Sequence, residues 1–145
     1  MKILVPTDGS TYAEEALAVA ADLVKMKGGE LCLISVVPSI EEFELEFSAG
    51  SRETIRQEFA ARAARIIEKG AAAAAAAGVK VICKSETSAV SIPGAIVEYA
   101  EKEGVDLIVM GTRGLGPSSL FKMGSVASKV VRHAPCSVYV VKKKA

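Results

Sequence analysis

Five short apolar runs alternate with stretches of helical periodicity along the chain, and this alternation constrains the fold more than any other feature. Most of the runs are almost continuously apolar, as expected for strands that are covered on both faces. They occupy residues 2–6, 30–37, 79–84, 106–110 and 137–141. The order β-α-β-α-β-α-β-α-β predicts an α/β fold, with one doubly wound, five-stranded parallel sheet and helices on both of its faces.

Four helices are predicted between these strands. They occupy residues 11–27, 51–77, about 93–104 and 124–133. Thr11 is followed three residues later by Glu14, the pattern of a capping box at the start of the first helix. Pro93 suits the first turn of the third helix, and Gly104 suits its end.

The second predicted helix has an apolar stripe that includes Phe59 and Ile66, which we expect to face the core. Glu58 and Arg62 are spaced to form an ion pair on its solvent side. Residues 38–50 before this helix fit neither a helical nor a strand period. They are predicted to be an irregular excursion, with an earlier start of the helix as the alternative.

Length and charge exclude several classes of protein. The chain has 145 residues, which suits one domain over 1–145, and 18 basic against 17 acidic residues give a net charge of +1. A net charge so close to zero argues against a nucleic-acid-binding protein.

The longest uncharged stretch, residues 87–97, is too short for a membrane helix of about 20 residues. No apolar signal segment fits the N-terminus, so a cytoplasmic location is expected.

The three cysteines, Cys32, Cys83 and Cys136, form no CxxC pair and no cysteine–histidine cluster. Cys32 and Cys83 lie within apolar runs, where free thiols are commonly buried. We therefore predict free cysteines and no metal site, with a disulfide or a metal role of the cysteines as the alternative.

Two segments that follow predicted strands carry residues suited to ligand binding. Residues 6–10 (PTDGS) follow the first strand, and residues 110–116 (MGTRGLG) follow the fourth and lead to 124–126 (GSV) at a helix start. Ligands of open α/β sheets bind beyond the carboxyl ends of the strands. Glycines allow close backbone approach, and a helix N-terminus attracts anions. The pattern favours a phosphate site, to which Arg113 or Lys122 could add charge, over a turn that only reverses the chain.

Better-known phosphate motifs are absent from the sequence. No GxxxxGK[ST] occurs, which excludes a P-loop NTPase. Residues 111–116 do not match GxGxxG and follow the fourth strand rather than the first, so the dinucleotide fingerprint is missing too. The first strand does not lead into an SGGxDS loop either, which excludes the PP-loop ATP pyrophosphatases.

Gly111, Gly114, Gly124 and Ser125 are spaced as glycine, two residues, glycine, nine residues, glycine and serine. This spacing resembles the signature of the universal stress proteins. The resemblance covers the whole chain, because KILVPTDGS, GVDLIVMGTRG, GSVASKVVRHAPC and VYVVK also look like this family and occur in its order.

The resemblance implies the strand order 3-2-1-4-5, a homodimer and bound ATP, with AMP and ADP as alternatives and Mg²⁺ carried on the phosphates. Asp8 would bond the ribose hydroxyls, the Val36 backbone would meet adenine, and the glycine segment with Thr7 nearby would hold ribose and phosphates. The nucleotide-binding residues expected on this basis are Pro6, Thr7, Asp8, Val36, Met110, Gly111, Arg113, Gly114, Gly124, Ser125 and Val126.

Simpler roles remain open for several of these residues. Asp8 precedes Gly9 and could serve only the turn, and Ser125 could only cap the last helix. His133, the single histidine, lies away from the proposed site. The chain also departs from the family: Ser91 and Ser137 replace a common glycine and a common proline, and residues 116–119 replace a bulkier, more basic stretch.

Two classes of function are weighed against each other. The favoured one is a nucleotide-dependent regulatory or stress-response module. The alternative is a slow ATPase or phosphotransferase. Such an enzyme would have to position the phosphates, neutralise their negative charge and orient a nucleophile. Asp8 is the one evident carboxylate at the site, so binding is favoured over turnover and no catalytic residue is assigned. A nucleotide-free dimeric scaffold or chaperone-like protein is a second alternative.

The last predicted strand bears on assembly. In the order 3-2-1-4-5 it lies at an edge of the sheet, and residues Val138–Val141 (Val138, Tyr139, Val140, Val141) contain no charge or proline. An apolar open edge is an aggregation hazard unless something pairs with it. A two-fold dimer in which two such strands meet is expected. Coverage of this edge by residues 38–50, which would leave a monomer, is the alternative.

Overall fold

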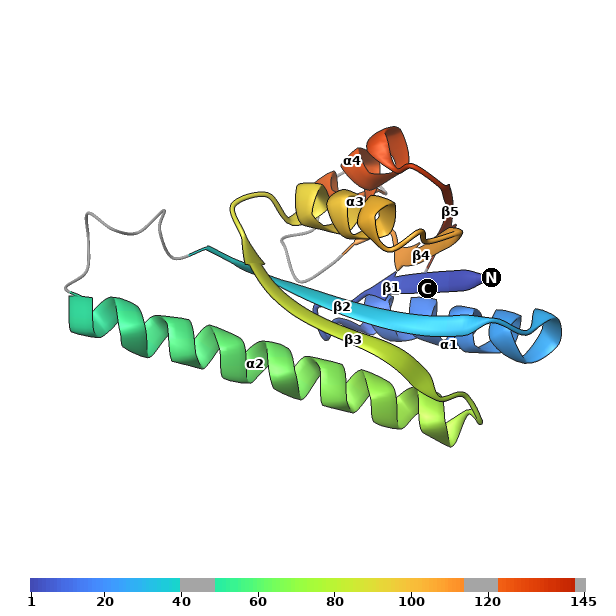
Figure 1. Ribbon diagram of the computed structural model, residues 1–145, viewed down its shortest axis with the longest axis horizontal. Helices are drawn as coiled ribbons and strands as arrows, with labels where there is room; N and C mark the ends of the chain where they lie inside the picture. Colours follow the sequence, from blue (N-terminus) through green and yellow to red (C-terminus); the bar gives the residue numbers. More distant parts are fainter. Residues whose placement is uncertain (40–48, 114–122, 143–145) are drawn as a thin grey trace.

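The structure, a computed structural model, describes residues 1–39, 49–113 and 123–142 (Figure 1). The described elements follow the predicted order. They are β1 (Lys2–Pro6), α1 (Thr11–Lys27), β2 (Glu30–Pro38), α2 (Ala49–Ala76), β3 (Val81–Ala89), α3 (Ile92–Lys102), β4 (Leu107–Gly111), α4 (Ser125–His133) and β5 (Ser137–Val141). All paired strands are parallel, in the order β3-β2-β1-β4-β5. The predicted fold class and strand order are confirmed.

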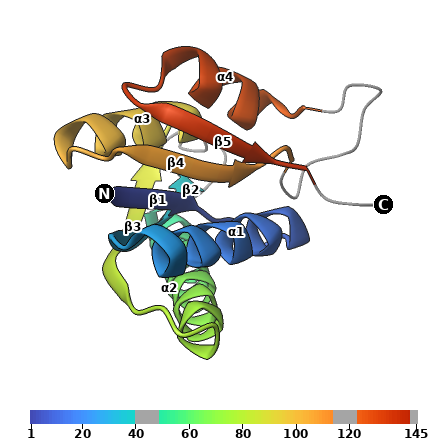
Figure 2. The same cartoon turned by 90° about the vertical axis from the view of Figure 1, so that its right-hand side faces the viewer.

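Helices cover both faces of the sheet: α1 and α2 lie on one side, and α3 and α4 on the other (Figure 2). The central strand β1 therefore sends alternate side chains into two cores. Ile3 and Val5 pack with Leu17 of α1 and Ile67 of α2, whereas Leu4 packs into the opposite core. Each fully buried aliphatic side chain contributes about 1.5–3 kcal/mol. Burial on both faces explains why β1 is almost continuously apolar.

β3 differs from the predicted strand 79–84, because it begins at Val81 and continues to Ala89. Its residues alternate between half-buried and exposed, and Ile82 is 56% exposed. This pattern is typical of an edge strand that is covered on one face. The prediction looked for an apolar run and therefore missed the polar end of the strand, Ser85–Ala89.

The start of α1 also differs from the prediction. Ser10, not Thr11, is the N-cap, and its hydroxyl accepts a hydrogen bond of 3.2 Å from the Ala13 N–H. The predicted capping box of Thr11 and Glu14 is wrong, because Thr11 is already the first residue of the helix. Glu14 instead forms an ion pair of 3.2 Å with Lys69 on α2.

α2 begins at Ala49, two residues before the predicted start, and so includes the end of the segment 38–50. Pro38 of that segment closes β2, and residues 40–48 lie outside the described part of the chain. Figure 1 shows the N-terminal part of α2 reaching past the sheet. The predicted pair of Glu58 and Arg62 is wrong, because the ion pairs between described residues do not include it.

The ends of α3 and α4 follow the expected chemistry. The Ser91 hydroxyl caps α3 by accepting a hydrogen bond of 3.1 Å from the Gly94 N–H, and Pro93 lies in the first turn. The hydroxyl of Ser91 thus supplies a side-chain cap that glycine could not supply. α4 begins at Ser125 behind the N-cap Gly124. Within the described ranges, no helix is both long enough and apolar enough to span a membrane.

Candidate functional site

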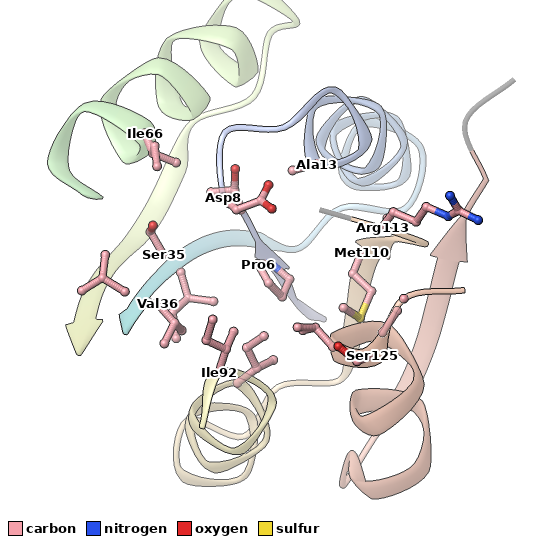
Figure 3. A pocket seen from close by; sticks show the side chains of 18 of the residues that line it. Pro6, Asp8, Ala13, Ser35, Val36, Ile66, Ile92, Met110, Arg113 and Ser125 are labelled. Carbon is pink, nitrogen blue, oxygen red and sulfur yellow. The ribbon is translucent and has the colours of Figure 1, made fainter. Parts of the chain in front are cut away.

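A cavity of about 1220 Å³ opens where the carboxyl ends of β1, β2 and β4 meet (Figure 3). The chain order reverses between β1 and β4, so the cavity lies at the switch point of the sheet, where ligands of such folds bind. The structure brings together every predicted site residue that it describes. Those that line the cavity are Pro6, Thr7, Asp8, Val36, Met110, Gly111, Arg113, Gly124, Ser125 and Val126. Gly114 and Lys122 lie outside the described residues.

The turn after β1 is held by local hydrogen bonds. Gly9 has a φ of 81°, which favours glycine, and its N–H donates to the Thr7 hydroxyl over 3.2 Å. Asp8 Oδ1 accepts a hydrogen bond of 2.9 Å from the Ser10 N–H. The Thr7 N–H donates to the Ile34 carbonyl of β2 over 2.9 Å. Asp8 therefore serves the turn, and its side chain also lines the cavity.

Gly111 ends β4 directly against the start of α1. A Cβ at this position would come within 2.8 Å of both the carbonyl oxygen and the Cβ of Tyr12. Real Cβ atoms essentially never approach backbone so closely, so a larger residue would force α1 away from the sheet. The glycine at 111 is therefore explained by packing against Tyr12, whereas the sequence had indicated close approach of a ligand.

The first turn of α4 borders the cavity through Ser125, Val126, Ala127 and Ser128. Its N-cap is Gly124, and within the described residues there is no side-chain cap hydrogen bond at this helix start. The simpler role considered for Ser125, as the cap of this helix, is therefore wrong. A helix start without a side-chain cap, facing a cavity, is suited to an anion.

Several lining residues were not predicted as part of a site. Ile92 and Ile96 of α3 make an apolar wall together with Val36, while Phe59, Arg62 and Ile66 of α2 close the opposite side. The sequence assigned Phe59 and Ile66 to the core and Arg62 to solvent. The three residues are spaced three and then four positions apart, which places them on one face of a helix. This spacing is the signal in the sequence that indicates a shared surface.

Few of the described lining residues are charged. Among them, Asp8 is the single carboxylate, and the cations are Arg62 and Arg113. In the described ranges, no group of three or more histidine, cysteine, aspartate or glutamate side chains could hold a metal ion. His133, at the exposed end of α4, is not among the cavity's lining residues. The described lining is therefore mainly apolar, with one carboxylate and two cations.

The cysteines are free, as predicted, and lie apart from the cavity lining. Cys32 of β2 is 0% exposed, and burial raises the pKa of its thiol to about 12. Its partner in the register with β3 is Cys83, which is only half-buried because β3 is an edge strand. Burial also raises the pKa of the Cys136 thiol.

Comparison with known proteins adds independent information. The model of the universal stress protein family matches residues 1–142. Universal stress protein MJ0531 of Methanocaldococcus jannaschii is 37% identical over 98% of this chain and 82% of its own. The solved structure of hypothetical protein MJ0577 superposes with a TM-score of 0.82 at 31% identity, covering 99% of this chain and 96% of that one.

More distant solved structures share the fold and contain nucleotides. One is a family member from Arabidopsis thaliana with AMP bound, at 22% identity and a TM-score of 0.71, covering 100% of this chain and 93% of that one. Another is the universal stress protein of Archaeoglobus fulgidus with dAMP, at 20% identity and a TM-score of 0.71, covering 98% of each chain. At these identities the likeness shows the fold alone.

Proposed function

The chain belongs to the universal stress protein family, and on that premise we propose that it is a regulatory module that binds ATP in the cavity between β1 and β4. One observation carries the proposal: the separate segments 6–8, 110–113 and 124–126 converge on that cavity, together with Val36. The nucleotides bound by the A. thaliana and A. fulgidus proteins support an adenine nucleotide as the ligand class.

The chemistry of the lining suggests how ATP would lie. Adenine suits the apolar wall of Val36, Ile92 and Ile96, with its polar edge toward the Val36 backbone. The ribose hydroxyls would donate to Asp8. The phosphates would lie at the uncapped start of α4, near Ser125 and the half-buried Arg113.

The same lining favours binding over turnover. Phosphoryl transfer needs charge neutralisation and an oriented nucleophile around the γ-phosphate. Asp8, the single carboxylate among the lining residues that the structure describes, bonds within the turn and, in this proposal, to the ribose. Mg²⁺ would therefore be held mainly by phosphate oxygens and water. Slow hydrolysis stays the alternative, and phosphate release with ATP and Mg²⁺ separates it from binding.

We also propose that two copies pair through β5, which forms one edge of the sheet. Tyr139 on this strand is 47% exposed, and the strand carries no charged residue between Ser137 and Val141. Pairing of two such edges would satisfy their open backbone groups. We further propose that the protein is located in the cytoplasm.

The test of ATP binding is the melting temperature. A ligand that binds only the folded state stabilises it by mass action, by about 2.7 kcal/mol at a hundredfold excess over Kd. We expect ATP to raise the melting temperature, and we expect adenine nucleotide to be released from freshly purified protein on heating. An unchanged melting curve at millimolar ATP, with no nucleotide recovered, would contradict the proposal and favour the nucleotide-free scaffold.

A further inference from the structure

A second, smaller hollow of about 250 Å³ adjoins the main cavity on the side of α2. Asp8, Arg62 and Ile66 line both hollows, so the two meet at the carboxylate proposed for the ribose. The described residues that line the smaller hollow are Asp8, Gly9, Arg62, Arg65, Ile66 and Lys69.

Contact between α2 and the turn after β1 fixes the place of this hollow. A Cβ at Gly9 would lie 3.3 Å from Cγ1 of Ile66, so α2 packs directly on the turn. Figure 3 shows Ile66 and Asp8 on neighbouring elements beside the cavity. Three cations of α2 lie beside Asp8 and within two helical turns of one another. They are Arg62, Arg65 and Lys69.

The charges around the hollow leave it net positive. Within the described part of the chain, neither Arg62 nor Arg65 forms an ion pair. Lys69 pairs with Glu14 over 3.2 Å, but both side chains are more than half exposed, and exposed pairs of this kind are weak. Lys69 can therefore exchange Glu14 for a stronger anion. Of the described residues that line the hollow, Asp8 is the single acid, and its Oδ1 already accepts a hydrogen bond from the Ser10 N–H.

We propose that this hollow binds a phosphate on the 2′ or 3′ oxygen of the ribose, so that the protein recognises an adenosine nucleotide phosphorylated both there and at the 5′ position. The inference rests on the proposed function, because it needs the ribose at Asp8. A phosphate on one ribose oxygen leaves the other hydroxyl to donate to Asp8. Guanidinium groups match phosphate oxygens with two parallel hydrogen bonds, which is the chemistry that Arg62 and Arg65 offer.

The test is calorimetric titration of the whole chain with AMP, adenosine 3′,5′-bisphosphate and adenosine 2′,5′-bisphosphate. We expect one bisphosphate to bind on the order of tenfold more tightly than AMP, as charge-assisted hydrogen bonds to a partly exposed phosphate allow. The variant Arg65→Gln with Lys69→Gln should lower this ratio from about tenfold to about threefold or less, because Arg62 alone remains in the hollow, and it should leave AMP binding unchanged. Arg62 is kept, because it also lines the main cavity.

The matched control is Arg52→Gln with Arg56→Gln, which removes the same charge from the same helix at residues that line neither hollow. This control should keep the preference for the bisphosphate. The subsite is refuted if AMP binds as tightly as both bisphosphates, or if the control loses the preference as fully as the test variant. Absence of binding by ATP as well as by AMP and both bisphosphates would instead refute the proposed function, and the subsite with it.

Discussion

The backbone N–H of Gly124 donates a hydrogen bond of 2.7 Å to the carbonyl of Thr112. This bond ties the start of α4 to the end of β4, so both borders of the proposed phosphate site are held together. A Cβ at Gly124 would lie 3.2 Å from the same carbonyl oxygen, a tight approach to backbone. Gly124 thus couples the position of α4 to the shape of the cavity.

Replacement of this glycine should affect binding more than folding. We expect Gly124→Val to weaken ATP binding at least about tenfold, because the side chain presses on the Thr112 carbonyl and crowds the helix start. Titration calorimetry measures the affinity, and circular dichroism checks the fold. Gly50→Val is the matched control, since a Cβ at Gly50 meets nothing within 4 Å. Equal ATP affinity in both variants would contradict the role of Gly124.

Asp8 has two separable roles, one in the turn and one proposed for the ribose. Asp8→Asn keeps an oxygen that can accept from the Ser10 N–H, whereas Asp8→Ala loses that bond at a cost of about 0.5–1.5 kcal/mol in stability. Both variants should bind ATP more weakly and inorganic triphosphate almost unchanged. Urea unfolding and calorimetry separate the two effects. Equal losses for ATP and triphosphate would contradict a contact with the ribose.

Pairing through β5 predicts a dimer that depends on the backbone of that edge. Val140→Pro removes an N–H donor and should give a monomer, whereas Val140→Lys keeps the N–H and tests the effect of charge at the edge. Light scattering measures the mass, and circular dichroism verifies that both variants fold. A wild-type protein with the mass of a monomer at high micromolar concentration would remove the basis of this pairing.

The buried thiol of Cys32 predicts a loss of stability at alkaline pH. Burial raises its pKa in the folded protein to about 12, above its ordinary value of 9.0. Between these values the unfolded chain has lost the thiol proton while the folded chain keeps it, so the free energy of unfolding falls as pH rises. Below pH 9 the thiol adds no pH dependence. Cys32→Ala should be less stable than the wild type near neutral pH. Its free energy of unfolding, measured by urea titration, should fall less steeply between pH 9 and 11. An equally steep fall in both proteins would contradict the raised pKa of Cys32.

The order of elements could be read from the sequence because the buried strands are apolar on both faces. β1 and β4 gave clear signals of this kind, whereas the polar end of β3 did not, since an edge strand is half exposed. Strand order came from the family resemblance, because helical crossovers alone do not determine which strands are neighbours. The Ser10 cap was missed because two hydroxyl residues, Ser10 and Thr11, are adjacent.

Much of the candidate site was predictable for a simple reason. Residues that follow parallel strands must share one edge of the sheet, so Asp8, Gly111 and Gly124 were expected to meet. The wall formed by Phe59, Arg62 and Ile66 was not expected. Their local pattern is that of an ordinary amphipathic helix, and only the packing of α2 across the sheet turns that face toward the cavity.

The central claim is that the cavity between β1 and β4 binds ATP. Equilibrium titration of the wild-type chain with ATP, followed by calorimetry, measures it most directly. We predict saturable binding of one ATP per chain, abolished or strongly weakened by Gly124→Val and retained by Gly50→Val. No heat of binding up to millimolar ATP, in protein shown to be folded and free of nucleotide, would contradict the claim.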